Sequence, residues 1–241
     1  MRTLRRFHLK GDFSTGEELT LDSYLSNYLS KVLRLKTNDQ IQCFNGKGLE
    51  VLCQLLSVNN KKTSIQVKSI ISKSDARKSK LQLAISLLKG QAMDRVMQQA
   101  TELGATDIWL VQSERTNVHY GGSKLQSKVG HWFKICVASS EQSRATFIPE
   151  IHEPSAIESV MERNKSAKRM VFDPAGITIE KELELTNRIL FVGPEGGWSS
   201  SELDFFKSRN AGIYSLGPRI LRAENVPSVA LALVEHAQNS Y

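Results

Sequence analysis

The chain has 241 residues, of which 40% are hydrophobic and 24% charged, and its formal net charge is +7. This length fits one large domain or two modest ones, and the composition is that of an ordinary soluble globular protein. Apolar runs are too short to cross a bilayer, and the basic N-terminus lacks the apolar core of a signal peptide. We therefore expect a cytoplasmic protein.

The positive charge is concentrated in the first third of the chain. Residues 1–80 hold 15 Lys and Arg against 7 Asp and Glu, whereas residues 81–241 hold 17 against 18, so the net charges are +8 and −1. Such asymmetry indicates that the basic part binds a polyanion, although a solvated basic surface explains it equally well.

The N-terminal part has the pattern of a small β domain with one helix. Asp22 can cap a helix whose apolar residues Leu25, Tyr28, Leu29, Val32 and Leu33 share one face. Asn45-Gly46 then separates two apolar strands in a hairpin pattern, and an alternating strand follows. We assign residues 1–72 to this domain and the polar residues 73–80 to a linker.

Residues 81–241 alternate between strands and helices. A buried strand from Leu81, a helix that stops at Gly104 and the apolar strand from Asp107 make a βαβ unit. The pattern continues with a helix through Trp132, a helix around Ile157–Met161, and strands "RMVFD", "RILFV" and "IYSLG", with a helix from about Ser200 and another from about Pro227. This alternation predicts an α/β domain with a largely parallel sheet.

Two glycine-containing loops follow adjacent strands of that sheet. "GPEGGW", residues 193–198, permits close backbone approach, and Ser199 with Glu202 predicts a capping box where the next helix begins. "LGPRILRAEN", residues 216–225, contains a Gly-Pro turn. Because ligands of open α/β sheets bind at the carboxyl ends of strands, the two loops together indicate a binding site. Neither matches a dinucleotide or P-loop motif.

These motifs resemble the bacterial small-subunit ribosomal RNA uridine-N3 methyltransferases, the RsmE type within the SPOUT superfamily. The likeness also includes "RRFHL", "VLRL", "LKGQAMDRVMQQATELGA", "SERT" at 113–116 and "KICVASSEQSRATFIPEI", and so covers nearly the whole chain in order. It implies a PUA-like β-barrel followed by a methyltransferase domain with a C-terminal trefoil knot, S-adenosylmethionine as cofactor, small-subunit ribosomal RNA as partner, and a homodimer.

The resemblance also implies the site residues. For the cofactor they are Leu190, Val192, Gly193, Glu195, Gly196, Gly197, Leu216, Gly217, Ile220, Leu221, Arg222 and Ala223. Glu195 has two interpretations of equal weight, a ligand contact or a carboxylate that accepts turn amides. Asn225-Val226-Pro227 departs from the family's usual Thr-Ala, which puts any role of a threonine hydroxyl in doubt.

Methylation at uracil N3 requires loss of an imide proton. We expect Arg222 to stabilise the resulting anion and Glu224 to accept the proton, the alternative being an ion pair or a helix-start carboxylate. For phosphate contacts we expect the basic residues near the N-terminus and one from "EQSR": Arg5, Arg6, His8, Lys31, Arg34 and Arg144.

No metal site is expected, because Cys43, Cys53 and Cys136 lack zinc-ligand spacing. Two other functions remain open at this point. A non-catalytic ribosome assembly factor would keep the basic domain without binding cofactor, and a related SPOUT enzyme would methylate a ribose 2′-OH or a transfer RNA.

Overall fold

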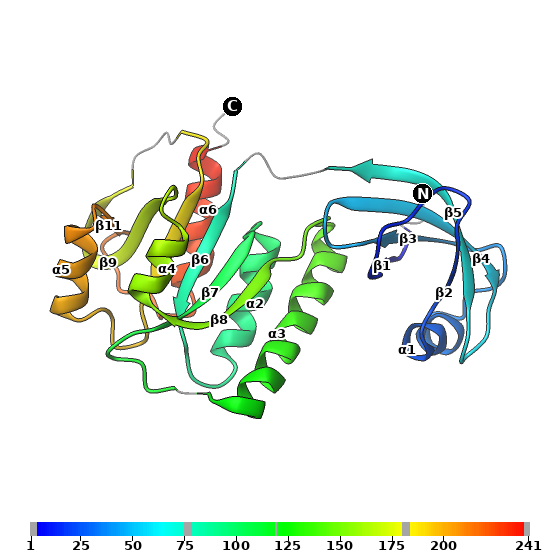
Figure 1. Cartoon of the computed structure of the whole chain (residues 1–241), viewed down its shortest axis with the longest axis horizontal. Helices are drawn as coiled ribbons and strands as arrows, with labels where there is room; N and C mark the ends of the chain where they lie inside the picture. The colour runs from blue at the N-terminus through cyan, green and yellow to red at the C-terminus, as the bar shows by residue number, and fades with distance from the viewer. Residues whose placement is uncertain (1–3, 75–78, 119, 180–183, 239–241) are drawn as a thin grey trace. The chain divides into compact units, whose positions relative to one another are not determined.

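The computed structural model describes residues 4–74, 79–118, 120–179 and 184–238. The chain divides into two compact units, which are Met1–Ala76 with Ser140–Phe147, and Arg77–Ser139 with Ile148–Tyr241. We call these unit 1 and unit 2 (Figure 1). Among the described residues no helix is long and apolar enough to cross a membrane.

Unit 1 contains a five-stranded sheet in the order β1-β3-β4-β5-β2. Its elements are β1 (Arg6–His8), β2 (Glu18–Thr20), α1 (Ser23–Asn27), the π-helical turn η1 (Tyr28–Val32), β3 (Gln40–Phe44), β4 (Leu49–Ser57) and β5 (Ser64–Lys73). The predicted hairpin is confirmed, since β3 and β4 pair antiparallel. The Asn45 side chain accepts the amides of Lys47 and Leu49 at its turn. Of the predicted linker, residues 75–78 lie outside the described residues, and Lys73 ends β5.

The predicted helix begins where expected and buries only part of the predicted face. Asp22 caps α1 by accepting the amide of Leu25 at 2.7 Å. Leu29 is fully buried, but Val32 is 61% exposed. The amide of Leu33 bonds to the carbonyl of Tyr28, a π-type bond that widens the turn and rotates later residues off the 3.6-residue stripe. Leu25 and Leu33 pack against the core of unit 1, so the predicted common face fails at Val32.

Unit 2 has a six-stranded sheet in the order β11-β9-β10-β6-β7-β8. Its elements are β6 (Leu81–Ser86), α2 (Ala92–Glu102), β7 (Asp107–Gln112), α3 (Gly122–Ser143), β8 (Glu150–Ala156), α4 (Ile157–Arg163), β9 (Lys168–Thr178), β10 (Arg188–Val192), α5 (Ser200–Ser208), β11 (Gly212–Ser215) and α6 (Val226–Gln238). All neighbouring pairs run parallel, which confirms the predicted parallel α/β sheet.

Helices cover both faces of this sheet (Figure 1). One core combines the sheet with α2, α3 and α6, through residues such as Met97, Trp132 and Leu231. The other combines it with α4 and α5, through Val160 and Phe206. Strand β10 lies inside the sheet with every residue buried, so its carboxyl end delivers the following turn to a rigid edge.

Strand β8 was not predicted from the sequence. Its sequence, EIHEPSA, is mostly polar and includes Pro154, and a proline argues against an inner strand. Because β8 pairs with β7 alone and forms the edge of the sheet, the missing amide of Pro154 interrupts no inner ladder.

Arg6 is a structural residue of unit 1. Its Nε donates to Glu50 Oε1 at 2.6 Å, and its terminal nitrogens donate to the carbonyls of Ser140 and Ala145 at 2.6 and 2.7 Å. The guanidinium lies 3.6 Å from the centroid of the Phe44 ring. The expectation that Arg6 contacts phosphate is wrong, because its side chain is only 4% exposed and fastens residues 140–147 to the sheet.

Removing the Arg6 side chain should lower the unfolding free energy of unit 1. Arg6→Ala leaves the partly buried Glu50 carboxylate without its cation, and breaking a buried pair of this kind costs about 3–5 kcal/mol of unfolding free energy. Urea denaturation followed by circular dichroism measures the change. The neighbouring exposed Arg5→Ala should stay within about 0.5 kcal/mol of the parent; equal stability of the two variants would contradict the structural role.

Candidate functional site

The first glycine loop begins where β10 ends. The amide of Gly197 bonds to the carbonyl of Pro194 at 2.9 Å, which closes a tight turn. Gly197 has φ +66°, in the left-handed region that favours glycine. A Cβ on Gly193 would come within 3.2 Å of the buried Trp198 ring, so backbone and indole pack closely there.

The predicted capping box at the start of α5 is confirmed. Ser199 Oγ accepts the amide of Glu202 at 3.1 Å, and Glu202 Oε2 accepts the amide of Ser199 at 2.8 Å. The other oxygen of the Glu202 carboxylate accepts the amide of Glu114 at 2.9 Å. One buried carboxylate therefore fixes both the loop after β10 and the loop after β7.

The second loop follows β11. The prediction that the two loops leave adjacent strands is wrong, since β9 lies between β10 and β11. The loops nevertheless meet, because all three strands are parallel and end at the same edge of the sheet. Gly217, with φ +114°, supplies the turn in this second loop.

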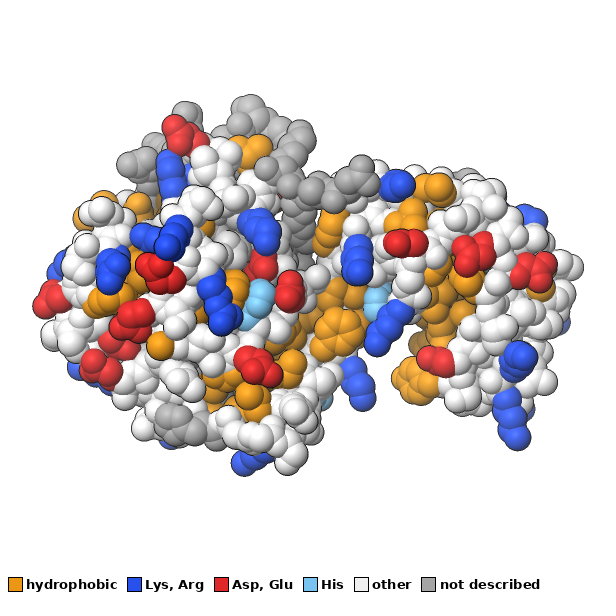
Figure 2. Space-filling view, viewed as in Figure 1, with side chains coloured by type: hydrophobic (Ala, Val, Ile, Leu, Met, Phe, Trp, Pro, Cys, Tyr) orange, Lys and Arg blue, Asp and Glu red, His pale blue; other side chains and the backbone are white. Residues whose placement is uncertain are grey.

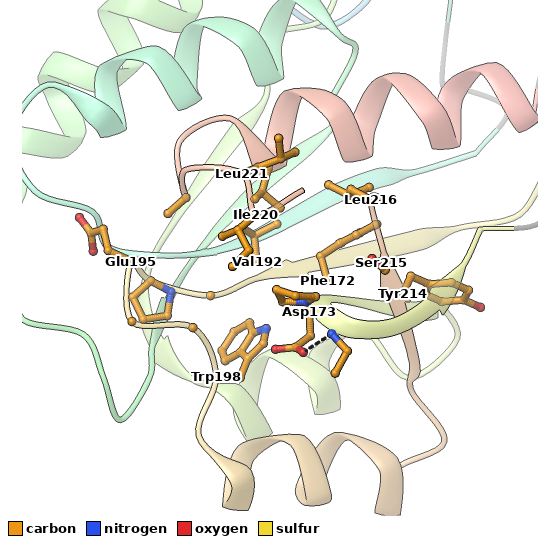
Figure 3. A pocket seen from close by; sticks show the side chains of 18 of the residues that line it. Phe172, Asp173, Val192, Glu195, Trp198, Tyr214, Ser215, Leu216, Ile220 and Leu221 are labelled. Atoms are coloured by element: carbon orange, nitrogen blue, oxygen red, sulfur yellow. Dashed lines mark hydrogen bonds between the residues drawn. The ribbon is translucent and has the colours of Figure 1, made fainter. Parts of the chain in front are cut away.

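The two loops enclose a pocket of about 430 Å³ (Figure 3), a volume typical of small-molecule sites. Most residues predicted to bind cofactor line it: Val192, Gly193, Glu195, Gly196, Gly197, Leu216, Gly217, Ile220, Leu221 and Ala223. Leu190 does not, because it is fully buried in the core below the loop. Arg222 and Glu224 do not line the pocket either, although both lie in the second loop, and Arg222 is exposed.

Several pocket residues were not predicted. Phe172 and Asp173 belong to β9, Tyr214 to β11, Trp198 to the first loop and Arg115 to the loop after β7. Figure 3 shows Phe172, Asp173 and Trp198 across the pocket from Ile220 and Leu221. Asp173 follows Phe172, the last β9 residue paired with β10, so its place in the pocket depends on the position of β9 between β10 and β11.

Glu195 accepts a backbone amide. Its Oε1 lies 3.1 Å from the amide nitrogen of Lys89, at the end of the segment after β6. The structure therefore gives Glu195 a role in joining loops, and the donor belongs to a different loop from the turn that contains Glu195. A contact between Glu195 and a ligand stays a prediction.

The remaining residues predicted to contact RNA lie in unit 1, and most of them are exposed. Arg5, Lys31, Arg34 and Arg144 face solvent. His8 differs, because its amide donates to Glu141, its ring packs on Phe44, and burial lowers its pKa. Figure 2 shows basic side chains spread over the visible face of both units, with acidic side chains among them.

Asp107, Glu150 and His152 could together approach a metal ion, since their ligand atoms lie within 4.8 Å of one another. They already bond among themselves: His152 Nε2 lies 3.1 Å from Asp107 Oδ1, and the imidazole stacks on Trp109 at 3.5 Å. Burial tends to raise the pKa of Asp107, but bonds from His152 and Thr106 and the charge of Lys80 lower it overall. These contacts explain the cluster as a structural one.

Comparison with known proteins identifies the class. A family model described as an RNA methyltransferase domain matches residues 75–235, and a model of the RNA methyltransferase PUA domain matches residues 25–68. A structure solved as a methyltransferase of Legionella pneumophila with bound cofactor SAM is 27% identical, with a TM-score of 0.87 over 98% of both chains.

Curated relatives define the family more closely. Ribosomal RNA small subunit methyltransferase E of Bacillus subtilis is 27% identical over 92% of this chain and 88% of its own. The enzyme of that name in Mesomycoplasma hyopneumoniae is 30% identical over 80% of this chain and 84% of its own. The chain belongs to the ribosomal RNA small subunit methyltransferase E family.

The double role of Glu202 leads to a stability prediction. Glu202→Ala removes the acceptor for two buried or partly buried amides, which should lower the unfolding free energy by about 2–4 kcal/mol. Asp204→Ala, two residues along α5, removes only an exposed ion pair with Lys207 and should change it by less than about 0.5 kcal/mol. Urea denaturation of both variants measures these changes. If Glu202→Ala lowers the unfolding free energy no more than Asp204→Ala does, the two loops keep their positions without the Glu202 carboxylate.

Proposed function

We propose that the protein transfers a methyl group from S-adenosylmethionine to N3 of a uridine in small-subunit ribosomal RNA. Membership of the methyltransferase E family supports the substrate class. The pocket between the two glycine loops is the observation that carries the proposal, because it lies at the carboxyl ends of parallel strands and contains most of the predicted cofactor residues.

The pocket suits this cofactor. Phe172, Val192, Leu216 and Leu221 offer an apolar surface for adenine, and the glycine backbone offers amides and carbonyls. The sulfonium is cationic, and the carboxylates of Asp173 and Glu195 in the lining favour a cation. When bound, the cofactor supplies an activated methyl group.

The chain's own residues must position the base and stabilise the charge it develops. The uracil imide loses a proton, and a fixed cation beside the ring carbonyls lowers the free energy of the anion. The roles of Arg222 and Glu224 as anion stabiliser and proton acceptor stay predictions.

The proposal includes the architecture implied by the family resemblance. Residues 1–72 form a PUA-like β-barrel that binds RNA, and residues 81–241 form a SPOUT-type methyltransferase domain with a C-terminal trefoil knot. Ser140–Phe147, which belong to unit 1, lie within the second of these ranges. The protein acts in the cytoplasm as a homodimer, on RNA within the small subunit.

A product assay tests the proposed activity. Small subunits from cells that lack this methylation are incubated with the protein and S-adenosylmethionine, and their RNA is digested and analysed by mass spectrometry. The expected product nucleoside is 3-methyluridine. A 2′-O-methyl nucleoside, or methylation of transfer RNA alone, would replace the proposal with a different RNA methylation.

The second loop yields a prediction on cofactor binding. Gly217→Val places a branched residue at φ +114°, which L residues rarely adopt, and should weaken S-adenosylmethionine binding at least tenfold. Titration calorimetry measures the affinity. Gly130→Val is the control, because Gly130 lies in α3 with open space where its Cβ would be. Parental affinity in Gly217→Val would place the cofactor elsewhere.

The exposed basic residues of unit 1 yield a prediction on RNA binding. Each contact to a single-stranded phosphate contributes about 0.7 to the slope of log K against log salt, so replacing Arg5, Lys31 and Arg34 by Gln should flatten it by about 2. Fluorescence anisotropy with an RNA oligonucleotide measures the slope. The same change at three exposed lysines of unit 2, Lys134, Lys165 and Lys207, is the control and should leave it unchanged.

A further inference from the structure

The "SERT" segment, residues 113–116, forms a braced loop at the end of β7. Ser113 Oγ lies 2.7 Å from Thr116 Oγ1 and accepts from Ser86 at 3.1 Å, and all three residues are buried. The amide of Glu114 donates to Glu202, and its carboxylate accepts from Ser201 at 2.8 Å. The hydrogen bonds of Ser113, Glu114 and Thr116 thus hold the loop in place.

Arg115 is the residue that this loop presents to the pocket. Its aliphatic stem lies over Gly196, whose Cβ position would be 3.4 Å from Arg115 Cβ and 3.5 Å from Cδ. Nη1 donates to the carbonyl of Gly196 at 2.9 Å, while the side chain lines the pocket and stays exposed. A guanidinium has five N–H groups, and in the described part of the chain this is the one bond that Arg115 forms.

The fixed guanidinium points to a chemical role. Arginine remains charged at any working pH and presents its donors in a rigid plane. A cation held by one N–H at the rim of a concave site can direct its other donors to a developing negative charge without reorganising. Arg222 is also exposed, but it does not line the pocket and therefore lacks this arrangement.

We propose that Arg115 is the catalytic cation that stabilises the anionic target base. This inference rests on the proposed uridine-N3 activity. The imide proton passes to solvent hydroxide to give water, N3 keeps the electron pair, and the negative charge spreads to the two ring carbonyl oxygens. Arg115 donates to one of those oxygens, which lowers the pKa of the bound imide.

Kinetics separate this role from a purely structural one. With cofactor saturating, Arg115→Gln should lower the maximal rate about 10²- to 10³-fold, comparable to the loss of one oxyanion donor. The rate of Arg115→Gln should also rise with pH over a more alkaline range than the rate of the parent, because without the cation the bound imide loses its proton at a higher pH. Arg115→Lys keeps the charge and should keep the parental pH profile with a smaller loss. Arg95→Gln, an exposed arginine of α2, is the matched control and should behave as the parent.

A binding measurement gives a readout independent of turnover. The protein is saturated with S-adenosylhomocysteine, and its affinity for an RNA oligonucleotide containing the target uridine is measured below and above the pKa of the free imide. The parent should gain affinity for RNA at the higher pH, relative to the same RNA with 3-methyluridine, which cannot ionise. Arg115→Gln should lose that gain, and calorimetry should show its cofactor affinity within about threefold of the parent.

The outcomes distinguish this inference from the proposed function. If the parent forms no 3-methyluridine, both fail. If the parent forms it but Arg115→Gln keeps the parental pH profile, or loses only cofactor affinity, Arg115 merely holds Gly196 and the inference is overturned. A shifted profile in Arg222→Gln with none in Arg115→Gln would assign the role to Arg222. If Arg115→Gln does not fold, Arg115→Lys is compared with a folded Arg115→Met. Equal shifts of the pH profile in these two variants would overturn the inference, because the charge that Lys keeps would then have no effect.

Discussion

The carboxylate of Glu202 is the interaction on which the pocket depends. One of its oxygens accepts the amide of Ser199 and completes the cap of α5, and the other accepts the amide of Glu114. A buried carboxylate is costly unless its oxygens are bonded, and here both are satisfied by amides from different loops. The geometry of the first glycine loop and the placement of Arg115 are therefore fixed by the same side chain.

The order of the strands explains why residues distant in sequence share this site. The parallel strands β11, β9, β10, β6 and β7 end at one edge of the sheet, so the loops after β7, β10 and β11 converge around a single pocket. Backbone contacts strengthen this convergence, as Arg115 donates to Gly196 and Glu195 accepts the amide of Lys89. The pocket is thus preorganised by loop-to-loop bonds as well as by the sheet.

Local patterns predicted the elements well and the site only in part. The capping box of Ser199 and Glu202 and the hairpin at Asn45 follow from rules that span a few residues, and both are confirmed. The positions of Arg115 and Asp173 in the pocket depend on strand order, which spacing along the chain does not contain. The predicted common face failed at Val32 for another reason, because the π-helical turn Tyr28–Val32 changes the helical period on which that prediction depended.

Counting charges misjudged Arg6 because the count takes no account of burial. The excess of +8 in residues 1–80 includes this arginine, whose charge is neutralised by Glu50 and whose donors bind carbonyls inside unit 1. An arginine can bind phosphate only if its donors reach solvent, and Arg5 and Arg34 meet that condition. The same test separates Arg115 from the buried Arg188, which donates to Thr186 and to the carbonyl of Glu184. In this chain, then, the donors that an arginine leaves available are a better guide to its function than its position in a basic segment.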